Sequence, residues 1–283
     1  MSNGKVVTSW DGYKFYIESK DDEQVIGKSE IANLKALATL SSKEKAFIDA
    51  GANLGFYTVR LAKYYEYVYA FEPEPRNFEL LSKNVKLNNI ANVSLLNFAL
   101  GDKNEKKYFY PKGSASTFLS GFVNEKPIEV NVVKGDDLLD KADVIKIDVE
   151  GYEYFVIKGL ENTISKFNPY ILIEHHDFRH YHTNFFPAIQ EFLKPRGYFF
   201  LFVTPVHRLW VHKSKQIQEY KFLLFHHWFN YCIRNLENGR PWYYGIPYEW
   251  WYGQNLIDFW YELPNHLESE PLWLSLVQGN GKV

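Results

Sequence analysis

The sequence predicts an α/β fold, a mostly parallel sheet of seven strands with helices on both faces. Apolar, strand-like runs alternate with helical segments along residues 46–203, the pattern of parallel strands joined by helical crossovers. A turn with two glycines follows the first run. Four runs end on acids, at Asp49, Glu72, Asp148 and Glu174. Because the carboxyl ends of parallel strands meet at one edge of a sheet, these acids predict a ligand site there.

The expected elements begin with a hairpin over residues 4–18, turning at Asp11-Gly12, and a helix over 29–40 capped by Ser29. The expected strands of the main sheet are 46–50, 67–71, 93–98, 143–149, 170–174, 198–203 and 209–212, the last antiparallel to the rest. The expected helices are 56–65, 75–87, 152–166 and 186–193. Two polar-edged strands, 106–110 and 128–133, flank a loop of small residues.

The turn after the first strand indicates which ligand the site holds. Its spacing is Asp-x-Gly-x-Asn-x-Gly, from Asp49 to Gly55, and Glu72 ends the second strand 17 residues later. A dinucleotide pyrophosphate favours a glycine where Asn53 stands, and an acid such as Asp49 repels it. The same acid suits a cationic amino-acid group, and Glu72 suits two ribose hydroxyls. The pattern therefore indicates S-adenosylmethionine rather than a nicotinamide dinucleotide.

Composition limits the class of protein and its partners. The 283 residues carry a formal net charge of -2, which argues against a general nucleic-acid-binding surface. Cys232 is the single cysteine, so a disulfide within the chain and a Cys-based zinc site are excluded. The first residues lack the apolar core of a signal peptide, and no run of 18 uncharged apolar residues occurs. We expect a soluble, cytoplasmic protein without a transmembrane segment.

Aromatic residues are unevenly placed, since seven of the eight Trp lie after residue 205. This shift predicts three regions: a hairpin and helix (1–44), a cofactor-binding core (45–204) and an aromatic-rich C-terminal extension (205–283). Aromatic faces suit stacking on sugar rings, membrane interfaces and subunit contacts. The extension is therefore a candidate to bind the acceptor, to form a homo-oligomer, or to pack over the core.

Five motifs, taken in order, resemble the FkbM-type methyltransferases: DAGANLG, AFEPEPRNFELLSKNVKLN, NFALGD, VIKIDVEGYEYFVIKG and PYILIEHH. They cover roughly residues 45–203. The resemblance implies a Rossmann-like class I methyltransferase fold, S-adenosylmethionine as the donor, and a hydroxyl acceptor on a sugar, glycan or other small molecule. It implies that the methionine side is held by Asp49, Gly51, Asn53 and Gly55, the ribose by Glu72, and the adenine by Asn97 and Ala99. It also places Asp148 beside the transferred methyl group.

Methyl transfer to an alkyl hydroxyl needs help, because such a hydroxyl holds its proton with a pKa of roughly 16. Asp148 and Glu150 follow the fourth strand, and Glu174, His175 and His176 follow the fifth. Asp148, Glu174 and His175 are candidate ligands of an octahedral Mg²⁺. Alternatively, His176 or His175 is a general base oriented by a carboxylate, or these histidines cap the strand end. The catalytic candidates are Asp148, Glu150, Glu174 and His176, with Asp148 first.

Other readings of the sequence remain open at this stage. A methyltransferase of RNA or protein would use the same cofactor site, although the chain shows no basic stripe. A non-catalytic carbohydrate-binding protein on the same fold would be expected to lose its cofactor acids, yet all four are present. Lys146 lies inside the apolar fourth strand, so it is predicted to form an ion pair with a carboxylate at the strand end.

Overall fold

The computed structural model describes residues 4–27, 30–120, 126–178, 183–204 and 206–215. In these ranges seven strands form the main sheet, in the order β13-β14-β10-β9-β3-β4-β5. All neighbours are parallel except β14, which runs antiparallel to β10 and to β13. The strands are β3 (Ala46–Ala50), β4 (Tyr67–Phe71), β5 (Val93–Leu96), β9 (Val144–Ile147), β10 (Tyr170–Glu174), β13 (Tyr198–Phe202) and β14 (His207–His212). The expected fold class is confirmed.

The order of the strands reverses at the centre of the sheet. From β3 the chain first adds β4 and β5 on one side, and later adds β9 and β10 on the other. The loops that leave β3 and β9 therefore diverge to opposite faces of the sheet. Such a switch point opens a crevice at the carboxyl ends of the two strands, and this is where α/β sheets bind ligands.

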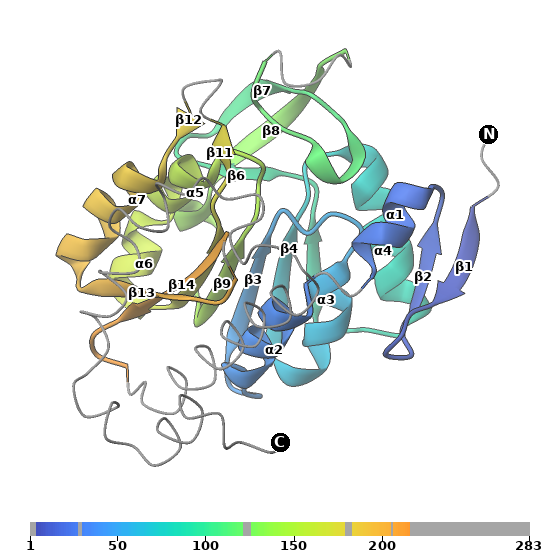
Figure 1. Ribbon diagram of the computed structural model, residues 1–283, viewed down its shortest axis with the longest axis horizontal. Helices are drawn as coiled ribbons and strands as arrows, with labels where there is room; N and C mark the ends of the chain where they lie inside the picture. Colours follow the sequence, from blue (N-terminus) through green and yellow to red (C-terminus); the bar gives the residue numbers. More distant parts are fainter. Residues whose placement is uncertain (1–3, 28–29, 121–125, 179–182, 205, 216–283) are drawn as a thin grey trace, which may run out of the picture.

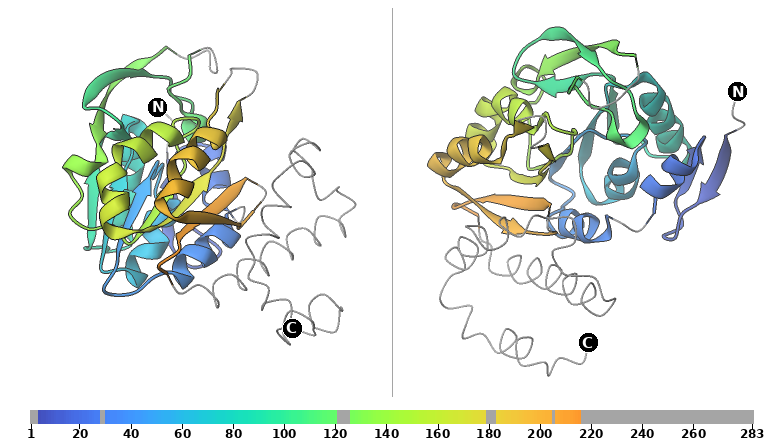
Figure 2. Two further views of the ribbon diagram at one scale, coloured as in Figure 1. Left: turned by 90° about the vertical axis from the view of Figure 1, so that its left-hand side faces the viewer. Right: turned by 45° about the horizontal axis from the view of Figure 1, so that its top comes forward.

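Helices cover both faces of the sheet (Figures 1 and 2). One face carries α2 (Ile31–Thr39), α3 (Phe56–Leu61) and α4 (Pro75–Leu87); the other carries α5 (Glu153–Gly159), α6 (Glu161–Phe167) and α7 (Phe186–Leu193). Side chains of β3 alternate between the two helical layers: Phe47 packs against the layer that contains α2 and α3, and Ile48 packs against the layer that contains α5, α6 and α7. Short 3-10 turns, at Ala62–Tyr64, Gly113–Ala115, Gly135–Asp137 and Lys194–Arg196, complete the helical segments.

The N-terminal hairpin is confirmed as β1 (Lys5–Thr8) and β2 (Lys14–Ile17), and it packs on α4 through Phe15 and Ile17. A further helix, α1 (Lys20–Val25), was not expected from the sequence. Its signal is nevertheless present, because Ser19 and Asp22 form a reciprocal capping box. Helix α2 begins at Ile31 with Glu30 at its N-cap; Ser29, the expected cap, lies outside the described residues.

A second sheet contains β6 (Ala99–Gly101), β8 (Ile128–Lys134) and β7 (Glu105–Phe109) in that order. It lies above the carboxyl ends of the parallel strands (Figure 1). The expected strand over 93–98 is therefore too long, because β5 ends at Leu96. The Asn97 amide donates to the carbonyls of Glu72 and Pro73, which ties the chain down at this turn. A short pair, β11 (Asp177–Phe178) and β12 (Thr183–Asn184), was not expected.

The single helix expected over 152–166 is wrong, since α5 and α6 are separate and meet at Gly159–Leu160. A β-carbon on Gly159 would lie 1.8 Å from the carbonyl oxygen of Gly101. Only glycine permits this approach of helix to strand. The break therefore reflects a tertiary contact with β6 that helical periodicity does not reveal.

The main sheet uses residues on both sides of the boundary expected at Thr204–Pro205, because β14 lies between β10 and β13. The aromatic segments 222–233 and 240–253 lie outside the described residues, and so do most of the Trp residues. A helix long and apolar enough to cross a membrane does not occur among the described residues.

Gly51 offers a stability test of the turn after β3. Its φ is +78° and an added β-carbon would lie 1.9 Å from the Asp148 carbonyl oxygen, whereas Gly12 (φ +89°) has open space. Gly12→Ala should therefore cost only the left-handed backbone penalty, about 1 kcal/mol. Gly51→Ala should cost more than about 2 kcal/mol, because it must also displace β9. Thermal unfolding midpoints check this, and equal losses for the two variants would contradict the argument.

Candidate active site

Two pockets open at the carboxyl ends of the central strands. Pocket A lies under the second sheet, and its lining includes Glu72, Pro73, Phe98, Ala99, Leu100 and Tyr152. Pocket B lies beside the α2–α3 face, and its lining includes Glu30, Phe56, Tyr57, Lys146 and Glu174. Both pockets are lined by Gly51, Asn53, Ser114, Asp148 and Glu150. The turn after β3 and the end of β9 thus form a wall that the two neighbouring pockets share.

Glu72 is the acid of pocket A, and the backbone holds its carboxylate. The N–H groups of Asn53 and Glu74 donate to its two oxygens at 2.8 and 2.9 Å. Burial raises the pKa of Glu72 to about 8, although these two N–H groups favour its ionised form. Each carboxylate oxygen keeps a second acceptor site, so the group can still receive hydrogen bonds from a ligand.

The turn between β3 and α3 takes its shape from left-handed residues. Gly51, Asn53 and Gly55 have φ of +78°, +52° and +99°. Gly51 and Asn53 line the pockets, whereas Gly55 begins α3, where a β-carbon would meet Leu81 at 2.9 Å. Gly55 therefore serves the packing of α3 on α4 rather than a ligand contact.

Asp49 is fully buried behind the turn and is not among the residues that line either pocket. It accepts a 2.6 Å hydrogen bond from the Thr58 hydroxyl, and the Lys146 ammonium lies 3.3 Å from its other oxygen. Lys146 also donates to the Gly51 carbonyl at 2.8 Å and lies 3.6 Å from Asp148. The expected ion pair of Lys146 is confirmed, and it fixes the turn to β9.

Ala99, with its neighbours Phe98 and Leu100, forms an apolar wall of pocket A. Asn97 does not line the pocket; its side-chain amide donates a hydrogen bond to the Glu72 carbonyl. A nucleoside fits this arrangement, since an anchored carboxylate faces a space with apolar and aromatic walls. The residues present therefore fit S-adenosylmethionine.

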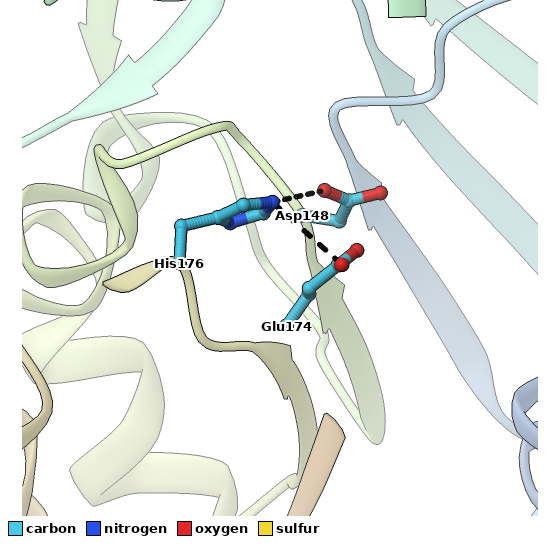
Figure 3. A group of neighbouring side chains, drawn as sticks. All are labelled: Asp148, Glu174 and His176. Carbon is cyan, nitrogen blue, oxygen red and sulfur yellow. Dashed lines mark ion pairs between the residues drawn. The ribbon is translucent and has the colours of Figure 1, made fainter. Parts of the chain in front are cut away.

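His176 is the centre of a charged group whose carboxylates Asp148, Glu150 and Glu174 line pocket B (Figure 3). Its Nε2 lies 3.3 Å from a Glu150 oxygen, 3.7 Å from Glu174 and 4.0 Å from Asp148. Its Nδ1 lies 2.8 Å from Glu153, a buried acid that also accepts the N–H of Gly151. Burial opposes a charged ring, but Glu150 and Glu153 raise the pKa of His176 well above its ordinary value.

The carboxylates around His176 respond differently to this environment. Burial opposes ionisation of Asp148, but Lys146 and His176 hold the pKa of Asp148 below its ordinary value. Burial raises the pKa of Glu150, against the opposing effect of His176. Glu150 also has a left-handed backbone, with φ of +50°, which is uncommon for a residue with a β-carbon. This conformation directs the chain from β9 toward α5.

His207 joins the same group from β14 and is not among the candidate residues chosen from the sequence. Its Nε2 lies 3.3 Å from Glu174 and 3.4 Å from Glu30. Burial opposes its charge, but Glu174 and Glu30 raise the pKa of His207. Tyr57 donates a 2.8 Å hydrogen bond to Glu30. The sequence analysis also did not select Glu30 and Glu153. For Glu153 the sequence held a signal, because the residue lies in the first turn of the helix that follows KIDVEG.

Of the three expected metal ligands, the structure brings together Asp148 and Glu174 but not His175. His175 is buried with its ring against Phe186, 4.8 Å between centroids, and its Nε2 has no hydrogen-bond partner among the described residues. Burial and the nearby Arg208 lower the pKa of His175 well below its ordinary value. His176 takes its place: ligand atoms of Asp148, Glu174 and His176 lie within 4.8 Å of one another. Successive residues leave β10 in opposite directions, which explains the exchange.

The seven-stranded sheet and the pocket at its switch point define a Rossmann-like α/β protein. The chain belongs to the methyltransferase FkbM domain family, whose sequence profile matches residues 49–200. The resemblance stated from the five motifs is thereby confirmed. Glu30 lies outside the matched residues, so pocket B, which Glu30 lines, extends beyond the family domain. His207 lies outside them as well.

Characterised relatives are distant. The chain is 26% identical over 148 residues to the hexuronic acid methyltransferase AglP of Haloferax volcanii, covering 50% of this chain and 61% of that protein. It is 26% identical over 144 residues to Methyltransferase 1 of Beauveria bassiana, covering 41% of this chain and 58% of that protein. The chain thus spans about three fifths of the length of these relatives. An FkbM methyltransferase structure from Methylobacillus flagellatus KT aligns with a TM-score of 0.46 and 19% identity, over 60% of this chain and 44% of that one.

Lys146→Met should destabilise the protein strongly. It leaves the buried carboxylate of Asp49 without its cation, and breaking a buried pair in this way costs about 3–5 kcal/mol. Lys158→Met is the matched control, because Lys158 is half exposed and pairs with Asp102 at 3.6 Å, so its loss should cost at most about 1 kcal/mol. Urea unfolding measures both. Similar losses would show that the Lys146–Asp49 pair does not support the turn.

Glu72 should make the stability of the cofactor-free protein depend on pH. The unfolded chain releases this proton near the ordinary value of 4.5, whereas in the fold the pKa is about 8. The contribution is therefore complete below pH 4.5 and is lost as the pH rises through 8. The free energy of unfolding should fall over this window, and less steeply in Glu72→Gln, which does not titrate. The exposed acid Glu129 provides the control Glu129→Gln; a wild-type slope in Glu72→Gln would contradict the assignment.

Proposed function

We propose that the protein is an S-adenosylmethionine-dependent O-methyltransferase that acts on a hydroxyl group of a sugar, glycan or other small molecule. One observation carries this proposal: the two pockets meet at Asp148. A donor in pocket A and an acceptor in pocket B would therefore face each other across that carboxylate. Membership of the methyltransferase family supplies the reaction class, and the pockets supply the places of the two substrates.

When bound, S-adenosylmethionine supplies a methyl group activated by a sulfonium. On the donor side, the Glu72 carboxylate accepts hydrogen bonds from the two ribose hydroxyls, and Leu100 and Tyr152 hold the base. The turn at Gly51 and Asn53 directs the methionine end toward Asp148. Asp49 stays behind the turn and acts through Lys146, as a residue that positions the loop. These contacts set the direction of the methyl group, which in-line transfer requires.

On the acceptor side, Asp148 orients the hydroxyl, and Glu150 receives its proton because it lines both pockets beside Asp148. The acceptor oxygen forms the new bond to carbon. The carbon–sulfur bond breaks with its electrons remaining on sulfur, so S-adenosylhomocysteine leaves as a neutral thioether. Glu174 and His176 hold the far side of the acceptor. General base catalysis of this kind contributes about 10²- to 10⁴-fold.

A sugar is the favoured class of acceptor. The Haloferax volcanii relative is by name a hexuronic acid methyltransferase, which favours a sugar. Pocket B offers aromatic faces, at Phe56 and Tyr57, beside carboxylates, a combination that binds sugar rings and their hydroxyls. RNA is disfavoured by the net charge of -2. A role of residues 205–283 in acceptor binding or homo-oligomer formation, and a cytoplasmic location, stay predictions.

Calorimetric titration with S-adenosylhomocysteine, with NAD as the comparison ligand, tests the donor site. We expect micromolar binding of S-adenosylhomocysteine and none of NAD. Glu72→Ala should weaken this binding by about 100-fold or more, because two hydrogen bonds to the ribose are lost. Asp148→Ala should retain binding and lose at least about 100-fold in methyl transfer from labelled S-adenosylmethionine to the best acceptor of a sugar panel.

Asp102→Asn is the matched control for both assays, since Asp102 follows β6 and does not line either pocket. It should bind and turn over like the wild type. Preference for NAD, or absence of S-adenosylhomocysteine binding, would overturn the proposed function. Full activity of Asp148→Ala would remove Asp148 from the reaction and leave the donor site intact.

A further inference from the structure

Three side chains from two neighbouring strands converge at Asp148, the carboxylate that lines both pockets. Asp148 follows β9, while Glu174 and His176 lie at the end of β10. One ligand atom from each lies within 4.8 Å of the other two. Figure 3 shows the imidazole and both carboxylates pointing toward one another, with His176 facing the two acids. We propose that Asp148, Glu174 and His176 bind one divalent cation of the Mg²⁺ or Mn²⁺ type.

The orientation of His176 supports a ligand role for its Nε2. The Nδ1 lies 2.8 Å from Glu153, which is itself fixed by the N–H of Gly151 at 2.9 Å. Glu153 is nearly fully buried, so this contact directs the ring from the protein side. A carboxylate that holds one ring nitrogen so that the other faces a metal is the usual outer partner of a metal-binding histidine. Glu153 is therefore a positioning residue for the site.

The distances suit a cation. Two ligands that bind an octahedral Mg²⁺ at about 2.1 Å lie about 3 Å apart when adjacent and about 4.2 Å apart when opposite. The Nε2 of His176 is 3.7 Å from Glu174 and 4.0 Å from Asp148. Side-chain movements of about 1 Å or less would bring these atoms to coordinating distance. Oxygen-rich ligand sets favour Mg²⁺ and Mn²⁺ over softer metals.

The charge of the surroundings also favours a cation. Ion pairs join six carboxylates, those of Glu30, Asp49, Asp148, Glu150, Glu153 and Glu174, to three basic side chains, those of Lys146, His176 and His207. Negative charge thus remains in excess even when both histidines are charged, and a cation that binds His176 would release the proton of its Nε2 to solvent. Uncompensated charge in a partly buried site is costly. A divalent cation would offset most of this excess.

The role of the cation rests on the proposed function. At the junction of the pockets it would contact the acceptor oxygen, and a bound cation makes a hydroxyl a stronger acid. Glu150, whose carboxylate lies 3.3 Å from the Nε2 of His176, would then receive the proton from an oxygen already polarised. The ion would also align the acceptor, because a single contact with Asp148 does not fully constrain the position of the acceptor oxygen.

The test uses the full chain, without donor or acceptor, and Mn²⁺ as the probe. Electron paramagnetic resonance measures free Mn²⁺ during a titration. We expect one Mn²⁺ per chain with a Kd below about 1 mM, and competition by Mg²⁺. Glu174→Gln and Asp148→Asn should each weaken binding by at least tenfold. Glu153→Gln should weaken it about 10- to 100-fold while leaving all three ligands in place.

Glu129→Gln and Asp102→Asn are matched controls that remove an acid elsewhere, and both should bind Mn²⁺ like the wild type. Circular dichroism of each variant shows that a loss is not caused by unfolding, and Glu174→Gln decides if Asp148→Asn does not fold. Absence of Mn²⁺ binding below 1 mM, or binding that Glu174→Gln leaves unchanged, would overturn the proposal. Binding of S-adenosylhomocysteine is measured separately, so failure of the metal site leaves the donor site untouched.

Discussion

The ion pair between Lys146 and Asp49 is the interaction on which the rest of the site depends. Lys146 lies within β9 and reaches across the sheet to Asp49, to the Gly51 carbonyl and to Asp148. It therefore fixes the end of β3 and the end of β9 at the point where the strand order reverses. Both pockets share this boundary, so one buried ammonium sets the distance between them. Burial makes that pair rigid, because either partner alone would be a buried, unpaired charge.

The sequence predicts most of the fold because the fold rests on local patterns. Strands with both faces covered are continuously apolar, and β3, β4 and β10 appear in the sequence with the bounds that the structure shows. The errors occur where contacts distant in sequence decide. The break at Gly159 depends on the backbone of Gly101.

The site was predictable only in part, for the same reason. Acids at strand ends locate the crevice, so Glu72, Asp148 and Glu174 could be chosen without a structure. Choosing between His175 and His176 requires knowing where β10 stops alternating, because one residue changes the side to which a ring points. Glu30 and His207 could not be found from the motifs. They come from opposite ends of the described chain, and the contacts of His207 with Glu30 and with Glu174 exist only in the fold.

The basic side chains around Asp148 and Glu174 matter because methyl transfer removes a positive charge. The proposed donor is a sulfonium, and its charge is already partly dispersed in the transition state. A purely negative surrounding would stabilise the bound donor more than the transition state, which slows the reaction. Lys146, His176 and His207 reduce that effect at the junction, and a divalent cation would reduce it further. The carboxylates can then orient the acceptor without stabilising the bound sulfonium donor more than the transition state.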